Sequence, residues 1–156
     1  MDRGFIIKLF PGLEHDEKFK VSSPEDTNYN CIAWAYKLFQ DRWMQPPNGA
    51  YIPMLDAISW WPDCGCEDMS IRSLVAAFES VGFISCSGFE HEKGYIKVAL
   101  YWNPLNGRWT HAARESRSGD YWMSKLGVGN DIQHKDPMSI EGGSYGKVFC
   151  FMKKEG

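Results

Sequence analysis

The chain has 156 residues, of which 44% are hydrophobic and 24% are charged. That length and composition suffice for a buried core, so we expect one globular domain spanning residues 1–156. The 17 basic and 20 acidic residues leave a net charge of −3, which favours neither nucleic acid nor an anionic membrane as a partner. No apolar stretch approaches the roughly 20 residues that are needed to cross a bilayer.

The N-terminal residues Met1–Lys8 lack the long apolar segment of a signal peptide. We therefore expect the protein to be cytoplasmic, or exported by a route that needs no cleavable signal. The five cysteines are an odd number, which fits a reducing compartment better than a disulfide framework. Cys64 and Cys66 are the local candidates for zinc ligands, but a zinc site needs about four ligands. We expect a loop with incidental thiols there, with no metal and no cofactor.

The first half of the chain is expected to be helical. After a loop at Val21–Thr27, a polar turn precedes a helix of roughly ten residues that begins at Cys31. A long loop follows, and its Gln45–Gly65 part is the expected lid or specificity element. Ser70 is the expected N-cap of a second helix, whose apolar residues recur at helical spacing until Gly82 ends it.

The second half is rich in strand patterns. Alternating apolar residues predict a strand at Tyr95–Trp102, and the turn residues Asn103–Gly107 follow it. Further strands are expected at Trp109–Arg117, Tyr121–Leu126, Asp131–His134 and Lys147–Met152. Helices first and an antiparallel sheet afterwards make an α+β layout, in which the nucleophile helix packs on the sheet.

Cys31 and His111 are the candidate nucleophile and base. Cys31 lies in the first turn of its expected helix, where unpaired backbone N–H groups and the positive end of the helix dipole stabilise a thiolate. His111 lies near the start of an expected strand and could lower the thiol pKa further by forming an ion pair. A cysteine nucleophile with a histidine base is typical of acyl chemistry at an amide bond. A buried core cysteine and a structural histidine are the alternative.

The order of a helix-borne cysteine and a strand-borne histidine resembles the papain-like superfamily, especially its compact bacterial cell-wall amidase and endopeptidase branch and the CHAP amidases. The resemblance covers roughly residues 28–152, the expected core. The motifs Tyr29–Ala35, Thr110–Arg114, Trp122–Gly127 and Asp131–His134 also look like an uncharacterised bacterial family usually placed in that superfamily. The resemblance implies a papain-like fold and cysteine peptidase or amidase machinery. Asn30 and Ile32 depart from the Asp and Gly usual in the cell-wall branch, so peptidoglycan specificity does not transfer.

A third catalytic member should hold the His111 ring in the useful tautomer. If the following hairpin has a two-residue loop at Ser118–Gly119, the numbers of paired residues sum to 237 and Ser124 shares the His111 face. Ser124 then occupies the third position but is a weak orienter. His134 and Asp131 have better chemistry on a later segment, and a simple dyad or a backbone carbonyl is a further alternative.

Acyl chemistry also needs hydrogen-bond donors aimed at the developing oxyanion. The backbone N–H of Cys31 is one expected donor, and the side-chain amide of Asn28 or Asn30 is a candidate for the second, although Asn30 could equally be a helix cap. Arg114 is expected to face away from His111, in a structural or surface role. The seven tryptophans are expected mainly in the core, with some lining a groove near the cysteine.

These patterns predict a thiol hydrolase that cleaves an amide or peptide bond through a Cys31 thioester, with His111 as base and acid. The substrate is expected to be a peptide, a protein or a peptidoglycan-like amide. The same dyad could transfer the acyl group or deamidate glutamine, because only the nucleophile that reaches the thioester differs. A non-catalytic binding or immunity-type module that keeps the fold is the alternative from another class. The sequence does not determine the oligomeric state.

Overall fold

The computed structural model describes residues 3–23, 51–52, 57–58, 70–125 and 131–156. Within these ranges, seven strands form one antiparallel sheet in the spatial order β1-β8-β7-β6-β5-β9-β4. In chain order these strands are β1 (Lys20–Ser23), β4 (Ile84–Cys86), β5 (Tyr95–Asn103), β6 (Arg108–Glu115), β7 (Trp122–Lys125), β8 (Asp131–His134) and β9 (Lys147–Glu155). The described helices are α1 (Arg3–Leu9) and α3 (Ile71–Ser80), with 3₁₀ turns η1 (Pro11–Leu13), η4 (Pro137–Ile140) and η5 (Gly143–Tyr145). This is an α+β arrangement, as the sequence predicts.

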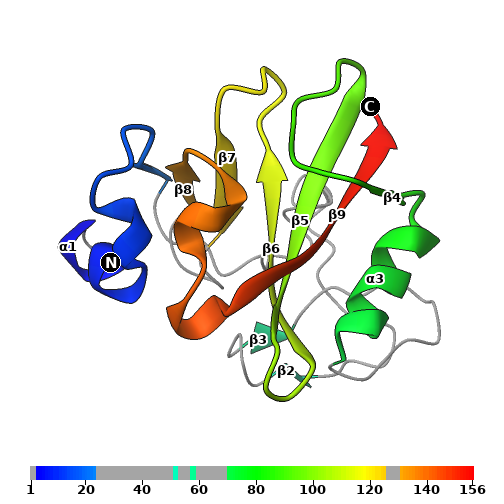
Figure 1. Cartoon of the computed structure of the whole chain (residues 1–156), viewed down its shortest axis with the longest axis horizontal. Coiled ribbons are helices and arrows are strands. Elements are labelled where there is room, and N and C mark those ends of the chain that lie inside the picture. Colours follow the sequence, from blue (N-terminus) through cyan, green and yellow to red (C-terminus); the bar gives the residue numbers. More distant parts are fainter. Residues whose placement is uncertain (1–2, 24–50, 53–56, 59–69, 126–130) are drawn as a thin grey trace.

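The central strands β5 and β6 match the predicted strands. Residues 97–101 of β5 are all buried, which requires side chains on both faces of the sheet to be covered. Figure 1 shows α1 on the β8 side of the sheet and α3 on the β4 side. The predicted strand Asp131–His134 is confirmed as β8, and β9 extends the predicted Lys147–Met152 strand to Glu155.

Helix α3 confirms the second predicted helix. The hydroxyl oxygen of Ser70 accepts a hydrogen bond from the backbone N–H of Ser73 at 3.3 Å, as an N-cap does. Gly82 follows the helix with a φ of +102°, in the left-handed region that glycine favours. The apolar face of α3 packs on β5 and β6 and buries Leu74 and Phe78.

The N-terminal segment covers a second part of the sheet. Ile6, Phe10 and Leu13 form a hydrophobic cluster with sheet residues that include Tyr101. The chain then enters β1, which pairs with β8. The predicted loop at Val21–Thr27 is therefore wrong for residues 21–23. The strand contains one apolar residue, so this sheet edge carries no alternating pattern.

The hairpin between β6 and β7 keeps the predicted register. Glu115 pairs with Trp122, so the numbers of paired residues sum to 237. The loop itself differs from the prediction, because the N–H of Ser116 donates to the carbonyl of Tyr121 at 2.9 Å and leaves residues 117–120 as the loop. The predicted loop at 118–119 and the observed loop at 117–120 have the same centre. The pairing register is therefore the same, and each strand residue lies on the predicted face of the sheet.

Several predicted features lie outside the described residues. They include the helix expected to begin at Cys31, with Asn28 and Asn30 before it. Of the Gln45–Gly65 loop, the structure describes only β2 (Tyr51–Ile52) and β3 (Ala57–Ile58), which pair with each other. None of the helices that the structure describes is long and apolar enough to span a membrane.

Candidate functional site

Three side chains from adjacent strands form a buried chain of hydrogen bonds. The hydroxyl oxygen of Ser124 on β7 lies 2.9 Å from Nε2 of His111 on β6 and 2.8 Å from Nε2 of His134 on β8. Nδ1 of His134 lies 2.8 Å from the carbonyl oxygen of Asp136. All three side chains are 0% exposed. We call His111, Ser124, His134 and the Asp136 carbonyl the histidine network.

The sheet register brings these side chains together. On β7 and β8, Ser124 pairs with Ile132 and Trp122 pairs with His134. Paired and alternate residues of antiparallel strands share one face, so Ser124 and His134 lie on the same face. The register of the β6–β7 hairpin adds His111 to that face. The sequence therefore predicted correctly that Ser124 lies beside His111.

Two carboxylates fix the backbone around the Asp136 carbonyl. The Asp136 side chain accepts a hydrogen bond from the N–H of Ser139 at 3.0 Å and caps η4. Asp16, from the N-terminal segment, accepts a hydrogen bond from the N–H of Lys135 at 2.8 Å. The residue before the carbonyl and the turn after it are both tied down, which positions the acceptor for His134.

Aromatic rings hold the imidazole of His111 in place. The ring of Tyr145 stacks on it with a centroid separation of 4.0 Å and an interplanar angle of 7°. Tyr101 packs on it at 5.3 Å and donates its hydroxyl hydrogen to the carbonyl of Pro137. The hydroxyl of Thr110, next to His111, donates to the carbonyl of Tyr145 at 2.6 Å. Rotation of the imidazole would have to displace these rings.

The surroundings keep both histidines neutral. Burial lowers the pKa of His111 well below its ordinary value, and the nearby His134 lowers it further. Burial also lowers the pKa of His134 to about 4, against smaller opposing effects of the Asp136 backbone and the Asp16 carboxylate. The ion pair expected between Cys31 and His111 needs a cationic His111, which its described neighbours disfavour.

Nδ1 is the ring nitrogen of His111 that the histidine network does not engage. Nδ1 is buried and makes no hydrogen bond with any residue that the structure describes. A buried polar atom normally has a hydrogen-bond partner. The candidate nucleophile Cys31 and the candidate oxyanion donor Asn30 lie outside the described residues.

Asp131 is the remaining sequence candidate for the third catalytic position. Asp131 begins β8 opposite Lys125, and the histidine network passes through Ser124 and His134 instead. The sequence analysis missed Tyr145 and the Asp136 carbonyl. Gly142, Gly143 and Gly146 all have positive φ and signal tight turns around Tyr145, but no local pattern indicates that its ring reaches His111.

The tryptophans that the structure describes support the expected core role. Trp109 and Trp122 are buried at 0% and 2% exposure, and Trp102 on β5 is partly buried. The other four lie outside the described residues. A groove lined by tryptophans near the cysteine stays a prediction.

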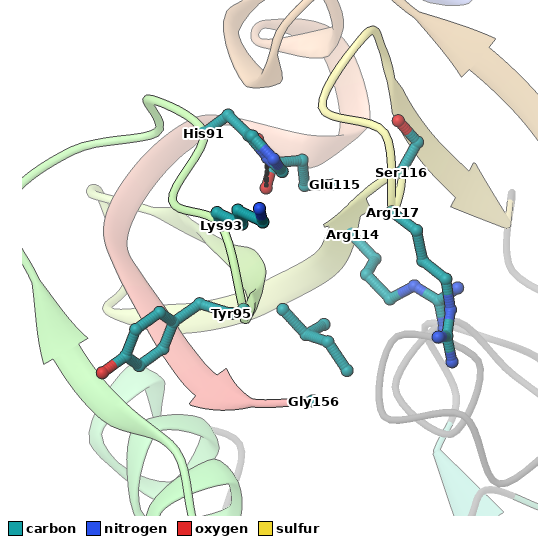
Figure 2. Close-up of a pocket in the computed structure, with 10 residues that line it drawn as sticks. His91, Lys93, Tyr95, Arg114, Glu115, Ser116, Arg117 and Gly156 are labelled. Carbon is teal, nitrogen blue, oxygen red and sulfur yellow. Dashed lines mark hydrogen bonds and ion pairs between the residues drawn. The ribbon is translucent and has the colours of Figure 1, made fainter.

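A separate pocket lies at the C-terminal end of β6. It has a volume of about 160 Å³ and is lined by residues that include His91, Arg114, Glu115 and Arg117. Figure 2 shows His91 beside Glu115, and the Arg114 and Arg117 side chains extending toward one region. Nδ1 of His91 lies 3.3 Å from Oε1 of Glu115. Arg114 is 8% exposed. Its pKa is lowered to about 10, mainly by burial and to a smaller extent by the positive charge of Arg117.

The metal candidates Cys64 and Cys66 lie outside the described residues. Across the part of the chain that the structure describes, no group of three or more His, Cys, Asp or Glu side chains could hold a metal ion. Cys86 and Cys150 are free thiols. Burial raises the pKa of both, that of Cys150 to about 11, so neither is activated as a nucleophile.

Comparison with known proteins gives a family but no activity. Neither the curated proteins nor the solved structures contain a match to this chain. A family described as "Domain of unknown function (DUF7689)" matches residues 20–153, a span that contains Cys31 and the whole histidine network. The chain therefore belongs to this family.

Proposed function

We propose that the protein is a papain-like thiol hydrolase that cleaves an amide or peptide bond, with Cys31 as nucleophile and His111 as base. One observation carries this proposal: the histidine network engages Nε2 of His111 and leaves Nδ1 without a partner among the described residues. An imidazole that is held through one nitrogen and unoccupied at the other is arranged like a general base. The sequence supplies a cysteine in a helix-start context as its partner.

The proposed reaction proceeds in two halves. Nδ1 of His111 takes the proton of the Cys31 thiol as sulfur attacks the carbonyl carbon, and the same proton passes to the leaving amine when the carbon–nitrogen bond breaks. The resulting thioester is hydrolysed by a water that gives a proton to Nδ1. That proton returns to the thiolate when the acid is released. The backbone N–H of Cys31 and the Asn30 amide are the proposed oxyanion donors.

Alkylation of Cys31 by iodoacetamide, followed by mass spectrometry, tests the pairing directly. We expect Cys31 to react faster than Cys86 and Cys150 at pH 7, and the His111→Gln variant to lower the Cys31 rate by at least about tenfold, because the variant lacks the base that accepts the thiol proton during the attack. The two other thiols are internal controls, and circular dichroism establishes that the variant is folded. An equal rate at Cys31 in the folded wild type and the folded variant would refute the pairing.

The burial of His111 favours a second candidate, a non-catalytic module in which the histidine network is structural. His111 is 0% exposed and lies under the ring of Tyr145. A catalytic base must be reached by the substrate, whereas a structural histidine needs no such access. This alternative predicts an ordinary reactivity of Cys31 and no loss of biological effect in Cys31→Ala. If Cys31 proves activated, trapping the acyl-enzyme with water or with an added amine separates hydrolysis from acyl transfer.

A further inference from the structure

The atoms of the histidine network fix the direction of each hydrogen bond. The carbonyl oxygen of Asp136 can only accept, so Nδ1 of His134 carries a hydrogen. A neutral imidazole has one N–H group, and Nε2 of His134 must therefore accept the hydroxyl hydrogen of Ser124. Because serine has one hydroxyl hydrogen, its oxygen then accepts from Nε2–H of His111. His111 is left with a bare Nδ1.

We propose that His134 is a positioning residue that acts through Ser124 and holds His111 in the Nε2–H tautomer. In this arrangement the two buried histidines are opposite tautomers, with the hydrogen on Nδ1 in His134 and on Nε2 in His111. The consequence for Cys31 rests on the proposed function, because only an unprotonated Nδ1 can take the thiol proton. The tautomers themselves can be tested without any reference to catalysis.

This role explains how serine can occupy the place of a catalytic orienter. A hydroxyl group can donate or accept, so Ser124 alone would stabilise either tautomer of His111. His134 removes that choice by taking the hydroxyl hydrogen. The choice is fixed in turn by a backbone carbonyl, which has no second protonation state.

The anchors of Asp136 make this direction a property of the fold. Asp16 holds the N–H of Lys135, and the Asp136 carboxylate caps η4, so the carbonyl cannot rotate away from His134 without breaking a second hydrogen bond. The stacked ring of Tyr145 keeps the His111 imidazole from exchanging its two nitrogens. Both ends of the network are therefore held independently of Ser124.

Nitrogen-15 NMR of the full chain labelled at histidine tests the assignment. The chain has four histidines, and long-range correlation from the ring C–H protons identifies which nitrogen of each neutral ring is protonated. At pH 7 we expect His134 as Nδ1–H and His111 as Nε2–H, assigned by the signals lost in His134→Leu and His111→Gln. The same tautomer in both rings, or a charged His134, would overturn the proposal.

Two variants then test the connection through serine. In Ser124→Ala we expect His134 to remain Nδ1–H, because its bond to Asp136 is intact, while His111 loses its single tautomer and gives averaged nitrogen shifts. His134→Leu should have the same effect on His111, whereas the surface variant His15→Asn should not change it. An unchanged His111 in a folded Ser124→Ala variant would mean that His134 does not act through Ser124. If a variant does not fold, through-bond correlation from each ring to its own backbone assigns the wild-type signals, and the wild-type tautomers still decide the proposal.

The alkylation rate of Cys31 separates this proposal from the proposed function. If both hold, His134→Leu lowers that rate roughly fivefold, the factor typical of one neutral hydrogen bond. An inert Cys31 in a wild type that shows opposite tautomers would refute the hydrolase and leave the positioning role intact. An activated Cys31 with unchanged reactivity in a folded His134→Leu variant would refute the positioning role alone.

Discussion

Acid should destabilise this fold through its buried histidines, and His134 allows the magnitude to be worked out. Burial lowers its pKa from 6.5 to about 4 in the folded protein. Between these values the unfolded chain binds a proton that the folded chain excludes. The free energy of unfolding therefore falls as the pH falls, by about 1.4 kcal/mol for each pH unit well inside the window and about 3 kcal/mol over all of it. Burial lowers the pKa of His111 as well, which adds a loss of the same sign.

Urea unfolding followed by tryptophan fluorescence, at several pH values between 4.5 and 7.5, measures this loss. The informative quantity is the slope of the free energy of unfolding against pH, compared between the wild type and His134→Leu. The absolute values are less informative, because the variant also loses hydrogen bonds at every pH. We expect the wild-type stability to fall about 1.4 kcal/mol more steeply per pH unit. Burial raises the pKa of Glu115, so this group makes the folded state more stable as the pH falls. The contribution is the same in the wild type and the variant, and it cancels in the difference between their slopes. The surface variant His15→Asn is the control, and parallel curves for the wild type and His134→Leu would refute the reasoning.

Three further substitutions should lower the free energy of unfolding in the same urea assay. The added methyl group of Gly12→Ala would lie 2.6 Å from the backbone oxygen of Ser139, so we expect a loss of roughly 1–3 kcal/mol; an unchanged midpoint would contradict the packing of η1 on η4. Ser70→Ala removes the N-cap of α3 and should cost about 1 kcal/mol, which a neutral result would contradict. Asp16→Asn removes one of two carboxylate oxygens that accept backbone N–H groups, including that of Lys135, and should cost roughly 1–3 kcal/mol; a stability equal to wild type would show that this anchor is dispensable.

The predictable part of the fold is the part with a local signal. The helix at α3 has a cap, a 3.6-residue apolar period and a terminating glycine, and β5 has alternating apolar residues followed by turn residues. The position of Ser124 beside His111 was predictable for a different reason. Pairing in a hairpin depends on the centre of its loop, so a wrong loop length with the right centre still gives the right register.

The other features depend on contacts between distant segments. The edge strand β1 has one apolar residue, and its pairing with β8 supplies the order that its own pattern lacks. Tyr145 reaches His111 from a segment more than thirty residues away in sequence. The acceptor for His134 is a backbone carbonyl, and any residue type could supply that atom. Side-chain identities therefore indicated the two histidines and the serine but could not indicate what orients them.

The chemistry of the histidine network also constrains how Cys31 would be activated. In a catalytic triad whose third member is Asp or Glu, the carboxylate stabilises the imidazolium that forms. The partner of His111 is instead the neutral hydroxyl of Ser124. A stable thiolate–imidazolium pair would need the Cys31 thiolate alone to outweigh the burial of the histidine. His111 is better suited to accept a proton during the attack than to hold one beforehand. We therefore expect the alkylation rate of Cys31 to rise toward neutral pH; a plateau that persists well below pH 6 and disappears in His111→Gln would show that a preformed ion pair exists after all.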